Sequence, residues 1–192
     1  MKAIVNVSPD WGIGKNGDLL VHIPEDMKRF RRLTKGKVVV EGLNTLKSFP
    51  GMKPLPGRVN IVLAEDLSMI PEESIRACDC YIDDTTKDVD PELFGRPEAT
   101  VMFACTSLGE ALEIICMFPG DDVFVCGGAS VYKLLLPWCD TALVTKNDCT
   151  EKADTFYPNL DEDPGWEIAE TEEEQEYEGI RFRNITYRRK DV

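Results

Sequence analysis

The sequence predicts an α/β fold, in which a mostly parallel sheet carries an antiparallel hairpin at one edge. Short apolar runs without polar alternation are typical of strands buried on both faces, and here they alternate with segments of helical spacing. Near the C-terminus the pattern changes to two alternating segments around an acidic turn, which is typical of an antiparallel hairpin. The 192 residues, 43 % apolar and 30 % charged, suffice for one such domain with a sizeable core.

The first half of the chain supplies three of the predicted strands and two helices. Residues 3–7 form a buried strand. Pro24 opens a helix, because proline suits the first helical position and the acids that follow favour the helix dipole. Residues 38–40 and 59–63 are the next buried strands, and a short helix over residues 44–47 lies between them.

The second half continues the alternation and ends on the hairpin. Further elements are predicted as strands over residues 101–104, 123–126 and 141–145, and as helices over residues 108–115 and from Gly128 to near Pro137. The hairpin joins residues 166–171 to residues 180–188 through the acidic turn Glu172-Glu173-Glu174. A bulge near Asn184 explains the change of parity in its second strand.

The segment of residues 65–98 does not follow the alternation. It is rich in Asp, Glu, Pro and Thr and carries one apolar patch, Cys80-Tyr81-Ile82. We therefore expect a partly ordered surface insertion within a single domain that spans residues 1–192.

The composition restricts the class of partner. Acidic residues outnumber basic ones by 35 to 22, and the formal net charge of −13 argues against binding to nucleic acid or to anionic membranes. No window of 18 uncharged apolar residues predicts a transmembrane helix. Seven irregularly spaced cysteines and one histidine predict free thiols in a reducing, cytoplasmic compartment rather than a metal site. The expected protein is a monomer that binds a small molecule.

Asp26 and Phe30 form the first candidate site. They are four residues apart and therefore share one face of the first helix. A carboxylate beside an aromatic ring can bind a flat, protonatable heterocycle through a bidentate pair. On spacing alone, an acid that merely favours the helix dipole is the commoner explanation.

Three further motifs are open to a binding role. Gly127-Gly128 follows a buried strand and opens a helix, where backbone amides attract phosphate, although a tight turn is the commoner reason for a lone glycine pair. Arg58 either clamps a carboxylate or is a solvated surface arginine. The glycine-rich segment of residues 11–18 is either a mobile lid or an ordinary flexible loop.

Taken together, the order and spacing of these motifs resemble dihydrofolate reductase. In chain order the motifs are GIGKNGDL at residues 12–19, PEDM at residues 24–27 with Phe30, LPGR at residues 55–58, Gly127-Gly128 with Tyr132, and ADTFYP at residues 153–158. Residues 65–98 lie outside this resemblance. It implies a sheet of eight strands with four helices, which binds NADPH and dihydrofolate.

The resemblance implies roles for the substrate-binding residues. Asp26 would be the catalytic carboxylate, paired with N3 and the 2-amino group of the pterin, and Thr145 would hydrogen-bond it. Arg58 would clamp the glutamate α-carboxylate of the substrate. The channel for the benzoyl-glutamate tail would be lined by Met27, Phe30, Phe49 and Leu55. Hydride would pass from C4 of the nicotinamide to C6 of the pterin, and a proton to N5.

The resemblance also implies a cofactor site. Asn6, counted with the substrate-binding residues, and Ile13 would offer backbone atoms to the nicotinamide amide. Gly127 and Gly128 would pack on the nicotinamide end. The other residues expected at the cofactor are Gly14, Leu19, Gly42, Asn44, Thr45, Leu63, Cys126, Ala129, Ser130, Val131 and Tyr132.

Three departures from the family pattern concern the substrate. Leu20-Val21 replaces a proline–tryptophan pair, Asn6 replaces a small alanine, and Glu41 replaces a methionine, where an acid is unexpected if buried. Two alternatives therefore stay open: another reductase of the same fold, such as the pyrimidine reductase of riboflavin synthesis, or a degenerate, non-catalytic paralogue that binds pterin or nucleotide. Asp26, Phe30 and Arg58 favour a pterin with a glutamate tail.

A further departure concerns the cofactor. Leu43, Ala64 and Glu65 stand where basic or hydroxyl side chains usually hold the 2′-phosphate of NADPH. An acid can instead accept a hydrogen bond from a ribose 2′-hydroxyl. The sequence thus predicts weak discrimination between the two cofactors or a preference for NADH, unless Lys47 or Lys53 compensates.

Overall fold

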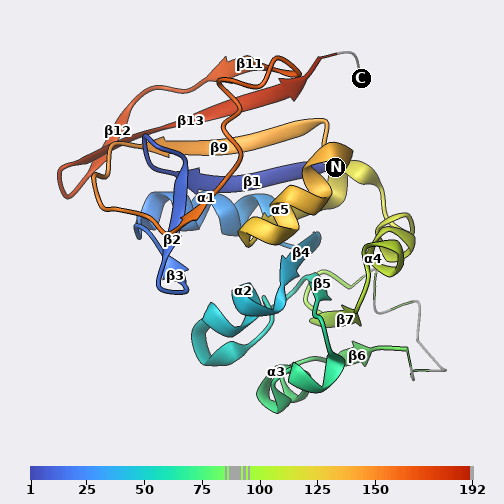
Figure 1. Cartoon of the computed structure of the whole chain (residues 1–192). Coiled ribbons are helices and arrows are strands. Elements are labelled where there is room, and N and C mark those ends of the chain that lie inside the picture. Colours follow the sequence, from blue (N-terminus) through green and yellow to red (C-terminus); the bar gives the residue numbers. More distant parts are fainter. Residues whose placement is uncertain (85, 87–91, 93, 95, 191–192) are drawn as a thin grey trace.

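One large twisted sheet with helices on both faces makes up the protein (Figure 1). The computed structural model describes residues 1–84, 86, 92, 94 and 96–190. The strands of the sheet are β1 (Lys2–Val7), β4 (Val38–Gly42), β5 (Val59–Leu63), β6 (Cys80–Ile82), β7 (Val101–Cys105), β8 (Val123–Gly127), β9 (Thr141–Asn147), β11 (Trp166–Thr171), β12 (Gln175–Tyr177) and β13 (Ile180–Arg189).

The order of the strands confirms the predicted fold class. Across the sheet the order is β11-β13-β9-β1-β8-β4-β5-β7-β6, and β12 also pairs with β13. Every pair from β9 to β6 is parallel, whereas β13 runs antiparallel to β9, β11 and β12. The described chain therefore has ten strands in this sheet rather than the expected eight.

Helices cover each face according to the alternation of side chains along the strands. On β4, Val38 and Val40 point into the main core, which α4 (Leu108–Ile115) and α5 (Ala129–Leu135) cover. The opposite face is covered by α1 (Pro24–Thr34) and by α2 (Leu43–Ser48), which packs with α3 (Glu72–Arg76) over the β5 and β7 end. The central parallel strands are thus buried on both sides, as the apolar runs predict, whereas the edge strand β11 is largely exposed.

The glycine-rich segment forms regular β-structure. Residues 12–19 form a hairpin of β2 (Gly12–Lys15) and β3 (Asp18–Leu19). The hairpin pairs with β10 (Thr155–Phe156) in a second, three-stranded sheet. Local sequence cannot show this pairing, because Gly14 and its partner Thr155 lie far apart in the chain.

The C-terminal hairpin differs from the prediction in two respects. Its tight turn lies between β12 and β13 at Glu178 and Gly179, both at positive φ, whereas Glu172–Glu174 only link β11 to β12 along one edge. The register shift lies in β11 between Ile168 and Glu170, not near Asn184. Asn184 and Ile185 are both buried because each face of β13 is covered there, so the parity change needs no bulge.

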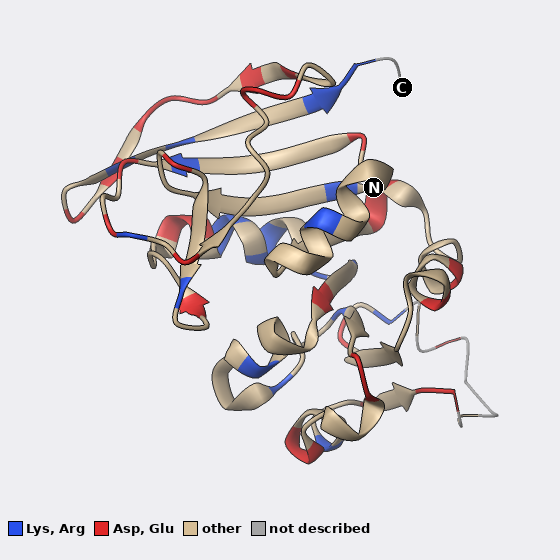
Figure 2. Cartoon of the chain, in the orientation of Figure 1, with Lys and Arg blue, Asp and Glu red and all other residues tan. Residues whose placement is uncertain are grey.

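Part of the segment of residues 65–98 belongs to the fold. β6 extends the parallel sheet beside β7, and Ile70 and Ile82 are buried. The remainder of that prediction falls partly on residues outside the described chain. Acidic side chains are prominent in the connection from β11 to β12 (Figure 2). None of the described helices has the length and apolarity needed to span a bilayer.

Candidate active site

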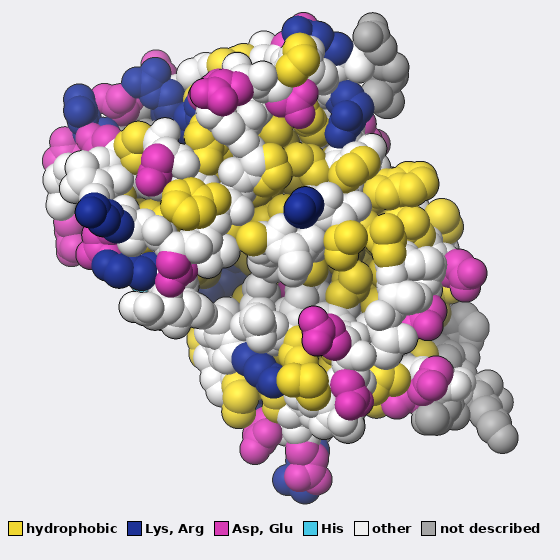
Figure 3. Space-filling view, viewed as in Figure 1, with side chains coloured by type: hydrophobic (Ala, Val, Ile, Leu, Met, Phe, Trp, Pro, Cys, Tyr) yellow, Lys and Arg dark blue, Asp and Glu magenta, His cyan; other side chains and the backbone are white. Residues whose placement is uncertain are grey.

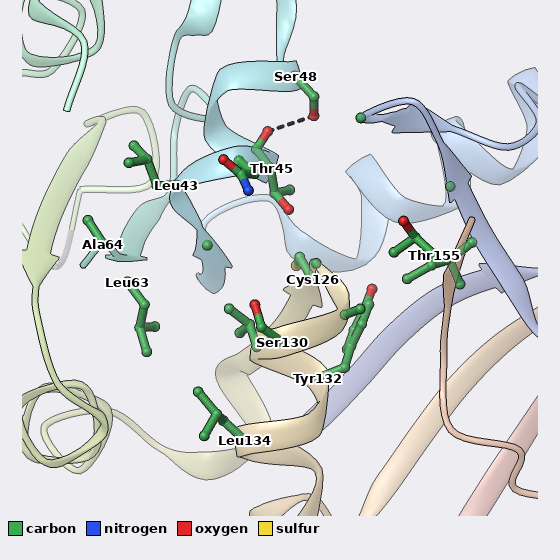
Figure 4. A pocket seen from close by; sticks show the side chains of 18 of the residues that line it. Leu43, Thr45, Ser48, Leu63, Ala64, Cys126, Ser130, Tyr132, Leu134 and Thr155 are labelled. Atoms are coloured by element: carbon green, nitrogen blue, oxygen red, sulfur yellow. Dashed lines mark hydrogen bonds between the residues drawn. The ribbon is translucent and has the colours of Figure 1, made fainter. Parts of the chain in front are cut away.

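A cleft of about 700 Å³ lies at the carboxyl ends of the parallel strands, hollowed between α2 and α5 (Figures 3 and 4). Open α/β sheets bind ligands at this edge. The structure brings most of the predicted residues to this cleft, namely Asn6, Ile13, Gly14, Leu19, Gly42, Asn44, Thr45, Leu63, Cys126, Gly128, Ala129, Ser130, Val131 and Tyr132. Gly127, Asp26 and Thr145 lie outside its lining.

Glycines allow the turns at the cleft to approach each other closely. A Cβ on Gly42 would come 3.1 Å from Val131 Cγ2, and one on Gly128 would come 3.4 Å from Thr45 Oγ1. Gly127 has φ +115°, and a Cβ there would come 2.9 Å from the Tyr132 ring. The β4–α2 and β8–α5 turns thus leave room that larger residues would fill.

Asp26 is placed by three elements that meet beside the cleft. Asn6 on β1 and Thr145 on β9 are direct partners in the parallel pairing, so their side chains stand together on the face that α1 covers. The first turn of α1 sets Asp26 above them. Asn6 Nδ2 donates to Asp26 Oδ2 at 3.0 Å, and the Thr145 hydroxyl donates to Asp26 Oδ1.

Two buried amides contact the residues that hydrogen-bond this carboxylate. Asn147, which is 5 % exposed, donates to Asn6 Oδ1 at 2.6 Å. Asn184 Oδ1 lies 3.0 Å from the Thr145 hydroxyl, and Asn184 Nδ2 donates to Glu172 Oε2 at 2.8 Å. Polar groups buried in this way form a connected network, which is stable only when its members are paired.

A cation on the next turn of α1 faces the same region. Burial lowers the pKa of Arg29, while the charges of Glu172 and Asp26 act in the opposite direction. Its Nη1 is buried without a hydrogen-bond partner in the described chain. The carboxylate of Asp26 therefore lies among two neutral donors and one positive charge.

Comparison with known proteins decides the family. The family model described as dihydrofolate reductase matches residues 1–90 and 93–189. The chain belongs to the dihydrofolate reductase family. The match continues through residues 65–90, which the motifs alone leave outside the resemblance, and α3 and β6 lie in that part.

Several curated relatives share this similarity over most of the chain. A dihydrofolate reductase of Mycobacterium leprae is 31 % identical over 92 % of this chain and 90 % of its own length. A dihydrofolate reductase of Bacillus subtilis is 30 % identical over 84 % of this chain and 76 % of its own length. A bifunctional dihydrofolate reductase–thymidylate synthase of Glycine max is 29 % identical over 83 % of this chain, which spans only 28 % of that protein.

Arg58 of the family's LPGR motif is buried rather than solvated. It is 5 % exposed, and its Nε donates to Thr34 Oγ1 at 2.9 Å. Its Nη1 and Nη2 donate to the carbonyls of Pro56 at 2.7 Å and Arg31 at 3.3 Å. A guanidinium has five N–H donors, so two are left after these bonds, and the surface-arginine alternative is wrong.

Glu41, at the position of the family's methionine, is fully buried. It is 0 % exposed, and neither carboxylate oxygen has a hydrogen-bond partner in the described chain. Burial raises the pKa of Glu41 well above its usual range, and the nearby Arg58 only partly opposes this. Burial without a hydrogen-bond partner thus disfavours the charged form of this carboxyl group.

The predicted tail channel is not part of the 700 Å³ cleft. Phe30, Phe49 and Leu55 are partly buried and Met27 is 42 % exposed, and none of the four lines the cleft. Sequence reasoning in turn missed other lining residues. Thr106 and Leu108 follow the end of β7, a position that the carboxyl-end rule could have found. Thr155 arrives through its pairing with Gly14, for which no local signal exists.

The charges in the cleft are all negative. Its lining contains Asp18 and Glu65, and within the described chain it contains neither lysine nor arginine. Leu43 and Ala64 line it as well. Lys47 and Lys53 are exposed outside the lining.

Proposed function

We propose that this chain reduces 7,8-dihydrofolate to tetrahydrofolate, with a reduced nicotinamide dinucleotide as the hydride source. The observation that carries the proposal is Asp26, one carboxylate hydrogen-bonded through both oxygens to neighbouring strands beside a ligand-sized cleft. The relatives from M. leprae and B. subtilis, which this chain matches over most of their length, are named for this activity.

Asp26 binds the pterin in this proposal. Its two oxygens match the N3–H and 2-amino donors of the ring, and the charged pair is shorter and stronger than a neutral one. A carboxylate held beside the ring stabilises the protonated form at N5, which accepts hydride at C6. When bound, the reduced nicotinamide supplies that hydride.

Arg58 and the side chains around it receive the glutamate tail. The two N–H donors that Arg58 does not use internally suit the α-carboxylate, because a guanidinium binds carboxylate in a fixed bidentate geometry. Phe30 and Met27 on α1, with Phe49 and Leu55, supply apolar surface for the benzoyl ring.

The cleft fits a dinucleotide, and its charges favour NADH. Gly42 and Gly128 leave space where a flat ring or a pyrophosphate can approach the backbone. The 2′-phosphate of NADPH carries close to two negative charges and needs basic or hydroxyl donors. Asp18 and Glu65 line the cleft without a cation, which supports weak discrimination or a preference for NADH, although the family generally uses NADPH.

The thiols support a reducing, cytoplasmic location, and we propose that the chain is a single-domain monomer. The seven cysteines all lie in the described part of the chain, and none of them forms a disulfide. Burial raises the pKa of Cys105 and Cys139 to about 12, so these thiols are unreactive at neutral pH.

Loss of reduced cofactor, followed by its absorbance, tests the proposal. Turnover that depends on dihydrofolate is the expected result. No turnover with dihydrofolate but turnover with a ribityl-aminopyrimidine phosphate would instead indicate the pyrimidine reductase. Binding of folate without any turnover would indicate the non-catalytic paralogue.

A further inference from the structure

The backbone fixes the orientation of one amide behind the active site, that of Asn147. Its Nδ2 donates to the Val7 carbonyl at 2.9 Å, and its Oδ1 accepts from the Cys149 N–H at 2.9 Å. A carbonyl can only accept and a backbone N–H can only donate. The Asn147 amide therefore has a single orientation that satisfies both.

That orientation determines the direction of the Asn6 amide. Asn147 Nδ2 lies 2.6 Å from Asn6 Oδ1, which must be the acceptor. The other end of the amide, Asn6 Nδ2, then faces Asp26 Oδ2 at 3.0 Å. The direction of this donor follows from Val7 and Cys149 alone.

Thr145 donates to the other oxygen of the same carboxylate. Its hydroxyl has one proton but lies within reach of Asp26 Oδ1 and, at 3.0 Å, of Asn184 Oδ1. Asn184 presents this oxygen because its Nδ2 donates to Glu172. One proton cannot serve both acceptors, and the contact to the carboxylate, which can only accept, is the shorter of the two. Thr145 therefore holds Oδ1 of Asp26, and the Asn6 amide, whose direction the backbone fixes, holds Oδ2.

We propose that Asn6 is a positioning residue that holds the Asp26 carboxylate in the plane required by a flat ligand edge with two N–H donors. Rotation of a carboxylate about its terminal torsion is soft, and productive geometry needs an orientation within about 10–20°. Asn6 also lines the cleft, so the residue that hydrogen-bonds Asp26 borders the space available to a ligand. The inference rests on the proposed function and deepens it.

The test compares two ligands that differ in one donor. Folate offers Asp26 two donors, whereas 2-desaminofolate lacks the exocyclic amine. Isothermal titration calorimetry on the whole chain should show that Asn6→Ala weakens folate binding about tenfold. Binding of 2-desaminofolate should change less than about threefold, because one donor does not need a fixed plane. Equal weakening of both ligands, or of neither, would overturn the proposal.

Asn147→Ala provides a second variant that acts through Asn6. It leaves Asp26 and Asn6 in place but frees the Asn6 amide, so the preference for folate should fall as in Asn6→Ala. The double variant should show no further loss of preference. Additive losses would contradict a role that runs through Asn6.

Asn60→Ala is the matched control for general loosening. Asn60 on β5 hydrogen-bonds to the backbone of Leu55, Arg58 and Val101. Its loss should lower the melting temperature and leave the folate preference unchanged. A loss of preference equal to that of Asn6→Ala would remove the case for Asn6.

Asp26→Asn separates the two levels of the proposal. If this variant binds folate as the natural chain does, the proposed function fails. If Asp26→Asn loses the preference for folate over 2-desaminofolate while Asn6→Ala retains that preference, only the inference about Asn6 fails.

Discussion

Glu41 is the residue whose burial opposes folding most clearly. Its carboxyl group is 0 % exposed, and neither oxygen has a partner in the described chain. Because burial raises the pKa of Glu41 well above about 4.5, the folded chain keeps a proton that the unfolded chain releases as the pH rises. Stability due to this group is complete below pH about 4.5 and is lost as the pH rises through the raised pKa.

Glu41→Met should therefore stabilise the protein at neutral pH. The change removes an unsatisfied buried polar group at similar volume, and the expected gain is about 1–3 kcal/mol in the free energy of unfolding. Urea denaturation of both proteins at several pH values measures it. The gain in the free energy of unfolding should grow from about pH 4 to neutral pH. Glu41→Gln should reproduce only the pH-dependent part of this gain, because glutamine has no group that ionises but is still polar. A gain that does not vary with pH would disprove the raised pKa.

Arg58→Leu should weaken dihydrofolate binding by about ten- to a hundredfold, because a charge-assisted bidentate pair contributes roughly 1.5–3 kcal/mol. A pteridine without the glutamate tail should bind almost as before. The melting temperature should also fall, since the carbonyls of Pro56 and Arg31 lose their donor. Equal weakening of both ligands would make Arg58 purely structural.

Spacing on one helix could predict the face that carries Asp26, but not what that face meets. Asn6 and Thr145 lie opposite each other only because β1 pairs in register with β9. Asn147 and Asn184 join the network through pairings between distant strands. Long-range register is not encoded in local patterns, so the contacts of Asn6, Asn147 and Asn184 could not be derived from the sequence, whereas the bond from Thr145 to Asp26 was expected from the family resemblance alone.

Among the elements, apolar runs and the alternating strands of the C-terminal hairpin were predictable, whereas the short strands β2, β3, β6 and β10 were not. β1, β4, β5 and β8 are buried on both faces and therefore lack alternation, which is the signal that identifies them. β6 has only three residues between polar segments, and its place beside β7 comes from tertiary pairing.

The β2–β3 hairpin depends on Gly12 at its base. A Cβ there would come 2.4 Å from Ala153 Cβ and 2.8 Å from Ser8 Oγ, so Gly12→Ala should cost about 1–3 kcal/mol of stability. Gly109→Ala in α4 is the control, because its Cβ would have only an ordinary contact at 3.9 Å and alanine favours the helix. Thermal unfolding of both variants measures this, and equal stabilities would refute the packing argument.

For the molecule as a whole, acids outnumber bases, and the cleft proposed to bind the anionic cofactor shares this excess. The formal net charge is −13, and the described lining adds Asp18 and Glu65 without a cation. Glu65→Arg, alone or with Leu43→Arg, should lower the Michaelis constant for NADPH relative to that for NADH about tenfold or more. Steady-state kinetics with each cofactor measures this ratio.

Glu167→Arg on the distant edge strand β11 gives the same change in net charge and should leave the cofactor ratio unchanged. Added salt should narrow the difference between the cofactors in the natural chain, since it screens repulsion of the 2′-phosphate. A natural Michaelis constant for NADPH about a hundredfold below that for NADH, corresponding to about 2.7 kcal/mol, would contradict the preference proposed for this cleft.

Turnover of Asp26→Asn, measured with dihydrofolate and reduced cofactor at neutral and at low pH, tests most directly whether this carboxylate carries the reaction. The variant should fold with an unchanged circular dichroism spectrum and lose about 10²–10⁴-fold in turnover at pH 7. Part of the rate should return at low pH, where the substrate is already protonated. Turnover close to that of the natural chain at pH 7 would contradict the assignment of Asp26 and, with it, the proposed chemistry.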